Sequence, residues 1–306
     1  MIQPRSVAVV GTGSVGIAAA YAMFMSRSAS ELLLVDKDAR RAEGHAMDLM
    51  HGQSLVGRVE VEAVSYAELV RAQVVVIAAG RSQKRGESRL DLLRGNADVV
   101  REVMERLDEY APEAVVLVAT NPVDVMTRLA AQRSRRPRER VLGTGTTLDS
   151  ARFRALLGSA LGVSPRSIHA YVLGEHGDSQ VPIWSQAAVG GLAVNLSDEE
   201  VARITRETRD AAREIIARKG YTDLAIGTVI AHLANAILSD ERSVHPLSVP
   251  LDGEYGLRDV ALSIPCVLGS GGAVSRFLPS LSQAELAALQ SSAEVLKLAE
   301  RALHST

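Results

Sequence analysis

The segment Gly174-Glu175-His176-Gly177-Asp178 sets a histidine between glycines and acids, directly after the apolar run at residues 170–173. Imidazole exchanges a proton near neutral pH, so His176 is a candidate acid–base group. The neighbouring glycines allow a sharp turn at a strand end, which would present the ring to a cleft. The alternative for this segment is a polar turn histidine without chemistry.

The segment Leu148-Asp149-Ser150-Ala151-Arg152 offers two partners for that histidine. Asp149 and Arg152 stand three residues apart in a predicted helix, so they share one face. Asp149 could hold one imidazole nitrogen and stabilise the charged ring. Arg152 could bind a carboxylate through two parallel hydrogen bonds. The alternative is an ordinary ion pair on a helix surface.

A glycine-rich turn, Gly11-Thr12-Gly13-Ser14-Val15-Gly16, lies between an apolar strand predicted at residues 7–10 and a predicted apolar helix. Gly11 permits the tight turn, Gly13 lets a pyrophosphate approach the backbone, and Gly16 lets helix and strand pack closely. The helix N-terminus then favours the phosphate charge. This context predicts a dinucleotide site rather than an ordinary tight turn.

Asp36, which ends the next predicted strand, indicates which dinucleotide binds. It lies twenty residues after Gly16. Its carboxylate would accept hydrogen bonds from the adenosine ribose and would repel a 2′-phosphate, so NAD is favoured over NADP. Val15 in the turn and Gly80, at the end of the apolar run 74–80, are further residues expected to contact the cofactor.

Together these groups are suited to hydride transfer. A hydride moving between a nicotinamide carbon and a 2-hydroxy carbon requires a proton to move on the oxygen. His176 would supply that proton during reduction and remove it during oxidation. Asn121, after the apolar run 114–120, could donate to a substrate oxygen or fix the nicotinamide. Its alternative is a helix cap, followed by Pro122 at the first helical position.

Strands and helices at these spacings predict an α/β chain. The continuous apolar runs at residues 74–80 and 114–120 are typical of parallel strands covered by helices on both faces. We expect an N-terminal doubly wound parallel Rossmann sheet in a cofactor domain of residues 1–145. An α+β catalytic domain of residues 146–306 would follow, packed across a cleft. Its charged helices open with the capping boxes Ser197-x-x-Glu200 and Ser282-x-x-Glu285.

The composition excludes several classes of protein. The 306 residues are 47% hydrophobic and 23% charged, with a formal charge of −2 and one cysteine, Cys266. We therefore expect no nucleic-acid or membrane partner and no cysteine-based metal cluster. Without a signal peptide or a membrane-spanning run, the expected location is the cytoplasm. The basic run at residues 133–140 lacks interleaved aromatics and predicts a solvated loop.

Four motifs together resemble those of the NAD-dependent L-lactate/malate dehydrogenase family. They are Gly11-x-Gly13-x-x-Gly16, Thr120-Asn121-Pro122, Leu148-Asp149-Ser150-Ala151-Arg152 and Gly174-Glu175-His176-Gly177-Asp178. The resemblance spans essentially the whole chain and implies a Rossmann domain, a catalytic domain and ordered binding with NAD first. It also implies a loop at residues 80–90 that closes over substrate, in which Arg89 polarises the carbonyl. The alternative for Arg89 is a solvated loop arginine.

One position of that loop separates the two substrate classes of the family. The second carboxylate of malate needs a positive charge there, for which the family uses arginine, whereas this chain has Gln83. A neutral Gln83 suits the methyl group of pyruvate and would leave a second carboxylate unpaired in a closed site. Thr222 matches the position that narrows the pocket from the other side. Both residues favour pyruvate and L-lactate.

The resemblance further implies a regulatory site. Arg154 projects about 200° round the helix from Arg152, and His169 lies seven residues before His176. Both resemble positions at which bacterial members bind fructose 1,6-bisphosphate between the subunits of a homotetramer. The alternative is an ion pair or a packing contact at a dimer interface.

Three other functions remain open. Malate dehydrogenase is the alternative within the enzyme class. NAD-dependent, metal-using glycosidases share the two-domain build, but they need metal-ligating Cys or His in the cleft, and Cys266 stands outside any His-bearing motif. A non-catalytic NAD sensor would not need Arg89, Asp149, Arg152 and His176 together.

Overall fold

A long mixed sheet runs through the centre of the computed structural model, which describes residues 5–81 and 89–304. Six parallel strands form its first part, in the order β3-β2-β1-β4-β5-β6. They are β1 (Ser6–Val10), β2 (Glu31–Val35), β3 (Glu60–Ala63), β4 (Val74–Ile77), β5 (Val115–Val118) and β6 (Val141–Gly143). The strand order reverses at β1, and ligands of such sheets bind outside the carboxyl ends of the strands at this point. The predicted doubly wound Rossmann sheet is confirmed.

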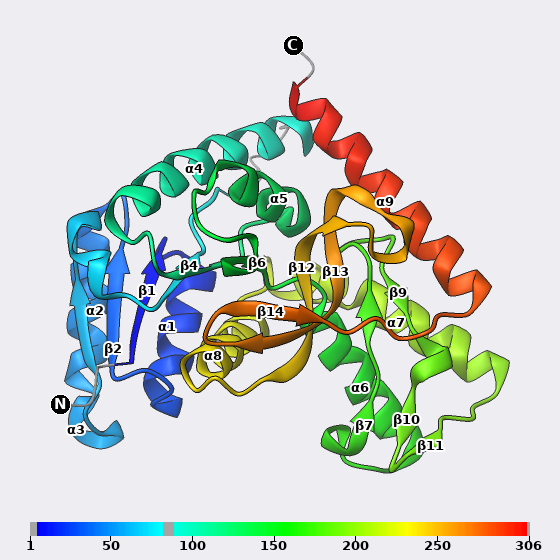
Figure 1. Cartoon of the computed structure of the whole chain (residues 1–306). Helices are drawn as coiled ribbons and strands as arrows, with labels where there is room; N and C mark the ends of the chain where they lie inside the picture. The colour runs from blue at the N-terminus through cyan, green and yellow to red at the C-terminus, as the bar shows by residue number, and fades with distance from the viewer. Residues whose placement is uncertain (1–4, 82–88, 305–306) are drawn as a thin grey trace.

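Helices cover both faces of the parallel strands. α1 (Ser14–Ser26) and α8 (Leu224–Leu238) lie below the sheet in Figure 1, and α4 (Arg89–Tyr110) and α5 (Val123–Arg133) lie above it. The others are α2 (Ala39–His51), α3 (Gln53–Val56), α6 (Thr147–Leu161), α7 (Asp198–Lys219) and α9 (Gln283–His304). Across the described ranges, no helix combines the length and the apolar character needed to span a membrane.

Three antiparallel strands extend the sheet beyond β6, and the sequence did not predict them. They are β12 (Ser243–Asp252), β13 (Arg258–Gly269) and β14 (Gly272–Arg276). β12 joins β6 where Ser248 pairs with Gly143. A Cβ at Gly143 would lie 2.2 Å from Thr127 Oγ1 of α5 and 3.0 Å from Ser248 Cβ of β12, so glycine lets both elements approach β6. The two predicted domains therefore share one sheet and do not only face each other across a cleft.

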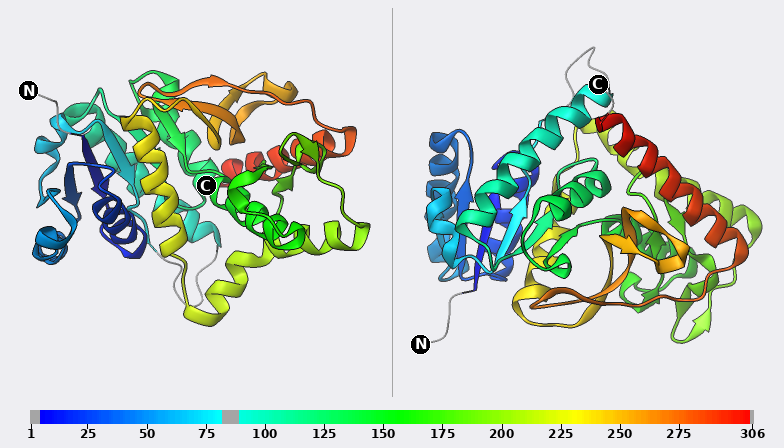
Figure 2. Two further views of the ribbon diagram at one scale, coloured as in Figure 1. Left: turned by 90° about the horizontal axis from the view of Figure 1, so that it is seen from below. Right: turned by 45° about the horizontal axis from the view of Figure 1, so that its top comes forward.

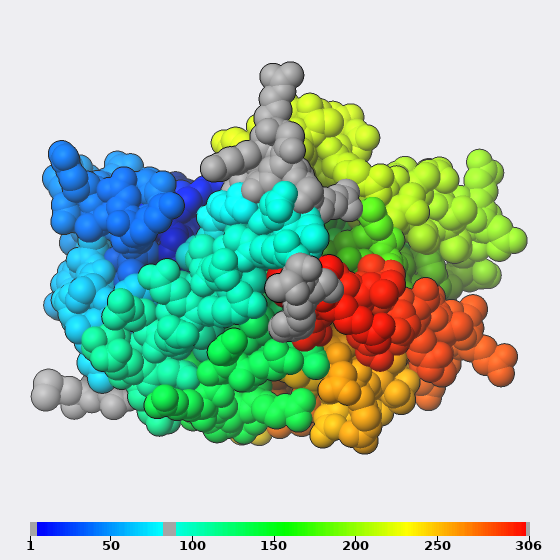
Figure 3. Space-filling view, turned by 90° about the horizontal axis from the view of Figure 1, so that it is seen from above, coloured from blue at the N-terminus to red at the C-terminus, as the bar shows by residue number. Residues whose placement is uncertain are grey.

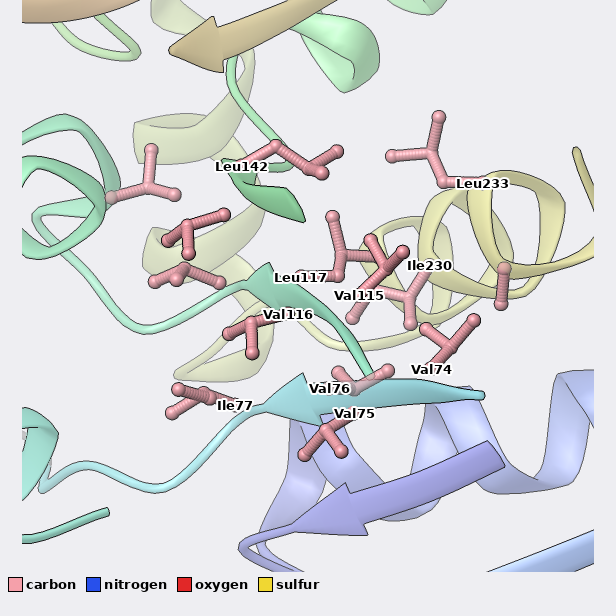
Figure 4. Close-up of a cluster of buried hydrophobic side chains, with 14 of the residues drawn as sticks. Val74, Val75, Val76, Ile77, Val115, Val116, Leu117, Leu142, Ile230 and Leu233 are labelled. Carbon is pink, nitrogen blue, oxygen red and sulfur yellow. The ribbon is translucent and has the colours of Figure 1, made fainter. Parts of the chain in front are cut away.

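The largest core also crosses the predicted domain boundary. In Figure 4, buried side chains of β4 and β5 lie against α8, where Ile230 and Leu233 are fully buried. α8 belongs to the second half of the chain, but it packs on the sheet of the first half. The predicted boundary between two domains after residue 145 stays a prediction.

A second, smaller core lies at the side of the molecule away from β3 (Figure 2). Two small sheets form there, from β7 (Ile168–His169), β10 (Ala188–Val189) and β11 (Leu192–Ala193), and from β8 (Val172–Leu173) and β9 (Val181–Pro182). Phe153 of α6 packs edge-to-face on Trp184, with ring centroids 4.9 Å apart. Val172 of β8 belongs to the same buried cluster, which packs α6, the helix that bears Asp149 and Arg152, against the strand that leads to His176.

The C-terminal helix reaches back to the first half of the chain. Figure 3 shows α4 in cyan and the end of α9 in red meeting on one face of the molecule. Arg94 of α4 lies 3.5 Å from the carbonyl of Ala302 in α9. The capping box at Ser282 is confirmed at the other end of α9, where Glu285 N–H donates to Ser282 Oγ. The box at Ser197 likewise opens α7.

The basic run at residues 133–140 is not simply a solvated loop. Arg136 is buried, and its Nη1 donates to Asp108 at 2.7 Å. Its Nη2 donates to the carbonyls of Leu107 and Ala111. The guanidinium thus binds carbonyls at the end of α4, where the Leu107 carbonyl also accepts from Ala111 N–H. The prediction is therefore wrong at Arg136.

Candidate functional site

The structure brings His176 and Asp149 together. Nδ1 of His176 lies 2.5 Å from Oδ2 of Asp149. The Asp149 side chain is 2% exposed, whereas the His176 side chain is 23% exposed. Asp149 therefore fixes the ring from the buried side and leaves Nε2 as the nitrogen available to a substrate. The predicted orienting role has the geometry that it needs.

Arg152 joins the same cluster from the next turn of α6. Its Nη1 donates to Oδ1 of Asp149 at 3.0 Å, so the carboxylate has one partner on each oxygen. Arginine has five N–H donors, and the remaining ones can bind an anion. Burial acts to raise the pKa of Asp149, but His176 and Arg152 hold that pKa below its ordinary value. Asp149 is therefore ionised at neutral pH.

The charge of Asp149 also sets the titration of the histidine. The negative charge of Asp149, opposed by burial, raises the pKa of His176 to about 8. The hydrogen bond that His176 Nδ1–H donates to Asp149 and the charge of Asp124 act in the same direction, and Arg152 acts against them. His176 is thus predominantly protonated at neutral pH in the free protein, ready to donate a proton.

The turn that bears His176 is held by side chains from two helices. Gly174, after β8, has φ +86°, and a Cβ there would lie 2.9 Å from Ser292 Oγ. Glu175 N–H donates to Ser292 Oγ of α9 at 2.9 Å. His176 N–H donates to Oδ2 of Asp124 at 2.8 Å. The glycine that the sequence motif contains is required both for the turn and for the closeness of α9.

Asp124 and Ser292 are site residues that the sequence reasoning missed. Asp124 lies in the first turn of α5, two residues after Pro122, and is 2% exposed. Its Oδ1 accepts a hydrogen bond from Ser248 Oγ of β12 at 2.6 Å. Burial, opposed by hydrogen bonds from Ser248 and His176, raises the pKa of Asp124 to about 6. Its place next to the Asn121-Pro122 motif was the only signal in the sequence.

The glycine-rich turn has the geometry of a phosphate-binding turn. Gly11 has φ +96°, and a Cβ there would lie 2.4 Å from the Ala79 backbone nitrogen. A Cβ at Gly16 would lie 1.8 Å from the Gly11 carbonyl oxygen. No described atom other than its chain neighbours lies within 4 Å of a Cβ built on Gly13, which precedes α1. Gly11 and Gly16 thus serve packing, and Gly13 leaves space at the helix N-terminus beside Val15.

Asp36 lies at the end of β2, in a hollow of about 360 Å³ lined also by Val64 and Tyr66. Its Oδ2 accepts from Thr12 N–H at 2.7 Å, and Arg41 Nη2 lies 2.7 Å from both carboxylate oxygens. Burial acts to raise the pKa of Asp36, but these hydrogen bonds and one from Asp38 N–H lower it to about 2. A ribose hydroxyl could bind here as predicted, in exchange for part of the Arg41 contact.

Asn121 lies where the sheet ends and is joined to Pro122 by a cis peptide bond. Pro122 is the N-cap of α5 and Val123 is its first residue, so the alternative that Asn121 caps this helix is wrong. Asn96 Nδ2 donates to the Asn121 carbonyl at 2.8 Å, and Asn96 Oδ1 accepts from Arg81 N–H. Asn96 thus ties the end of β5 to the chain that leaves β4.

Gly80 lies in the same tight region between the ends of β4 and β5. A Cβ there would lie 2.9 Å from Thr120 Cγ2. The next residue, Arg81, turns back onto α4, where its Nη2 donates to the Asp91 carbonyl and its guanidinium lies against Gly95. Arg81 therefore packs on α4.

Other predicted residues lie outside this cluster or outside the described part of the chain. Gln83 falls in the undescribed segment, and for Arg89 the structure describes only its place as the first residue of α4. Thr222 lies half-buried between α7 and α8, next to Asp223, which caps α8 and pairs with Lys219 at 2.5 Å. The predicted contacts of these residues with substrate stay predictions.

Arg154 and His169 come together away from His176. Both line a hollow of about 600 Å³ on the outer side of α6, with Arg166, Tyr171 and Val244. Arg166, which the sequence did not point to, also lines the hollow. Burial lowers the pKa of Arg154. Three side chains that can bear positive charge around one hollow form a candidate anion site.

The chain is similar to lactate dehydrogenases over nearly its full length. Family models for the lactate/malate dehydrogenase NAD binding domain and alpha/beta C-terminal domain match residues 5–143 and 146–303. L-lactate dehydrogenase of Salinibacter ruber is 55% identical, covering 97% of each chain, and that of Thermus aquaticus is 46% identical, covering 97% of this chain and 99% of the other. The structure of a minor L-lactate dehydrogenase from Enterococcus mundtii superposes with a TM-score of 0.95 at 38% identity, covering 98% of each chain.

Proposed function

The chain belongs to the lactate/malate dehydrogenase family and acts as an NAD-dependent L-lactate dehydrogenase, and we propose that His176, Asp149 and Arg152 perform its reversible reduction of pyruvate. The observation that carries this proposal is the continuous chain of contacts from Arg152 through Asp149 to His176. It supplies a carboxylate binder, a fixed anion and a proton donor within two adjacent elements.

The residues at the sheet end fit NAD. The space beside Gly13 and the free N–H groups at the start of α1 suit a pyrophosphate. The hollow beside Asp36 suits an adenosine. Val15, Gly80 and Asn121 follow the carboxyl ends of β1, β4 and β5, where they would contact the cofactor. NAD, when bound, supplies the hydride acceptor and NADH the hydride donor.

His176 moves the proton. Because Nδ1 is held by Asp149, Nε2 donates to the pyruvate oxygen during reduction and accepts the hydroxyl proton of L-lactate during oxidation. Asp149 stays ionised and stabilises the protonated ring. The same pair keeps the ring from rotating, which maintains the line between Nε2 and the substrate oxygen.

Arg152 and four further side chains complete the proposed site. Arg152 binds the pyruvate carboxylate, and Asn121 donates to the substrate oxygen. Arg89 polarises the carbonyl when the loop closes, which strengthens its effect as water leaves. Gln83 and Thr222 restrict the pocket to a substrate with a methyl group in place of a second carboxylate.

We further propose that the hollow at Arg154 and His169 binds fructose 1,6-bisphosphate and that the protein forms a homotetramer. The cationic side chains around the hollow support an anionic ligand. Pyruvate saturation curves with and without fructose 1,6-bisphosphate, over a range of pH, test this, and Arg154→Ala should abolish any response. The exposed Arg218 on α7 offers a control, Arg218→Ala. No response at any pH would contradict the effector, and light scattering tests the tetramer.

The central experiment is NADH oxidation with pyruvate. Activity should fall by roughly 10²–10⁴-fold in His176→Ala, because the general acid is lost. Oxaloacetate is the competing substrate, and a higher kcat/KM for it would make the malate dehydrogenase alternative correct. An active His176→Ala variant would contradict the proposed role of the histidine. The cytoplasmic location stays a prediction.

A further inference from the structure

The buried carboxylate under the His176 turn has no assigned part in the reaction. Asp124 lies on α5, in the first half of the chain, and its two oxygens contact the main chain of His176 and the hydroxyl of Ser248. We propose that Asp124 is a positioning residue, which holds the main chain of His176 so that the ring meets Asp149 and the substrate. This inference rests on the proposed function of His176.

The hydrogen bond acts directly on the functional residue. His176 N–H donates to Oδ2 of Asp124 at 2.8 Å, and the ring of the same residue is held at Nδ1 by Asp149. His176 is thus fixed at two points, one on the main chain and one on the ring. With both fixed, the direction of Nε2 has little freedom left.

The contacts of Asp124 with His176 N–H and with Ser248 Oγ, called the clamp below, join three parts of the fold. Asp124 belongs to α5, Ser248 to β12, and His176 to the turn after β8. Ser248 also lies at the single pair that joins β12 to β6. The neighbouring anchor of the same turn, Ser292 on Glu175 N–H, is neutral and comes from α9. The N–H groups of Glu175 and His176 therefore donate to side chains of different helices. Of the two acceptors, that of His176 N–H is a carboxylate and that of Glu175 N–H is a hydroxyl.

The burial of Asp124 argues against a purely incidental contact. A buried carboxylate is costly unless it is paired or hydrogen-bonded, and folding alone would be served by a neutral acceptor. The charged groups that face it are the His176 ring and Glu175, with opposite effects on its pKa. The ring itself faces Asp149, Asp124 and Arg152. Asp124 therefore adds a second negative charge beside the protonated ring.

Two substitutions separate the acceptor from the charge. Asp124→Asn keeps an oxygen for His176 N–H, and its amide can donate to Ser248 Oγ. Asp124→Ala removes both. We expect Asp124→Ala to lose roughly 100-fold in kcat/KM for pyruvate with an unchanged Kd for NADH. Asp124→Asn should retain most of the kcat/KM of the parent chain at low pH, because the amide oxygen still accepts the hydrogen bond that positions His176.

The His176 titration provides a readout that does not depend on turnover. The ring is followed by NMR in protein with ¹³C-labelled histidine, and its signal is assigned by its loss in His176→Gln. In Asp124→Asn the pKa of His176 should fall below its value of about 8, because a nearby negative charge is removed. Asp198→Ala, on the exposed first turn of α7, is the control and should leave activity and titration unchanged.

The outcomes are distinct. A folded Asp124→Ala variant with the kcat/KM of the parent chain would overturn the proposal. An Asp124→Asn variant with an unaltered His176 pKa would also overturn it, because the carboxylate would then not lie beside His176, and this measurement does not require Asp124→Ala to fold. An Asp124→Asn variant as inactive as a folded Asp124→Ala variant would also overturn it. Failure of the proposed function is separate, because the unsubstituted protein would then not reduce pyruvate, whereas the NMR titration would still report on the clamp.

Discussion

Asp149 and His176 form a pair with one buried and one accessible member. The Asp149 side chain is 2% exposed and the His176 side chain 23% exposed, and 2.5 Å separates Asp149 Oδ2 from His176 Nδ1. Among the described residues, it is therefore the ring that exposes this pair to solvent. Asp149 cannot exchange protons directly, so it acts as a fixed charge. In the proposed mechanism, the proton that moves therefore belongs to His176.

The pH dependence of the two reaction directions should be opposite. A pKa raised to about 8 means that His176 is protonated below this pH and neutral above it. Pyruvate reduction needs the protonated ring, so its kcat/KM should fall as pH rises through about 8, whereas that for L-lactate oxidation should rise. Initial rates over pH 5–10 measure this. Asp149→Asn should move both profiles to lower pH and reduce kcat/KM by roughly 10²–10⁴-fold; profiles that did not move would contradict the role of Asp149.

Arg152→Lys should weaken pyruvate binding although it preserves the charge. Lysine can still pair with Asp149, but it cannot form two parallel hydrogen bonds with a carboxylate. The loss of one charge-assisted bond predicts a fall of roughly 10- to 100-fold in kcat/KM for pyruvate, with an unchanged Kd for NADH. Arg213→Lys, in an exposed ion pair with Asp178, is the matched control. Equal kinetics for Arg152→Lys and the parent chain would rule out the carboxylate contact.

Local sequence predicted the parts of the fold that depend on local rules. The apolar runs that became β1, β4 and β5 were predicted because strands buried on both faces are continuously apolar. Asp149 and Arg152 were predicted to share a helix face because helical spacing places residues three apart together. These relations need no knowledge of the rest of the chain.

Relations between distant segments were not predictable. β12 contains Pro246 and Pro250 and is nearly all buried, so it shows neither the alternation nor the uninterrupted β-formers by which strands are recognised. Asp124 stands in the sequence as one of many acids, and its contact with His176 exists only because α5 and the turn after β8 meet in space. Arg136 was placed in solvent for the same reason, since its partners belong to the end of α4.

Gln83→Arg should shift substrate preference from pyruvate to oxaloacetate. A guanidinium at this loop position would pair with the second carboxylate, which predicts a rise of roughly 10- to 100-fold in kcat/KM for oxaloacetate relative to pyruvate. The matched variant is Arg81→Gln, two residues earlier, where the guanidinium packs against Gly95 of α4. It should leave the preference unchanged. If Arg81→Gln altered the preference and Gln83→Arg did not, Arg81 would be the residue that faces the substrate.

The glycines of the turn before α1 should separate folding from cofactor binding. In Gly16→Ala the new Cβ would lie 1.8 Å from the Gly11 carbonyl oxygen, so β1 and α1 must move apart. Overpacking of this kind costs roughly 1–3 kcal/mol, which a lower Tm would report. A Tm equal to that of the parent chain would mean that the helix does not approach the strand so closely.

Gly13→Ala should have the opposite signature. Gly13 has φ −70°, and no described atom other than its chain neighbours lies within 4 Å of the added Cβ, so the folded protein accepts the methyl group. The methyl group would occupy the space proposed for the pyrophosphate, and loss of one charge-assisted bond predicts NADH binding weaker by roughly tenfold or more, measured by fluorescence titration. Gly44→Ala, in the middle of α2 and equally open, is the control: it should bind NADH normally and gain up to about 1 kcal/mol of stability. Equal NADH affinities in the two variants would show that the pyrophosphate does not lie beside Gly13.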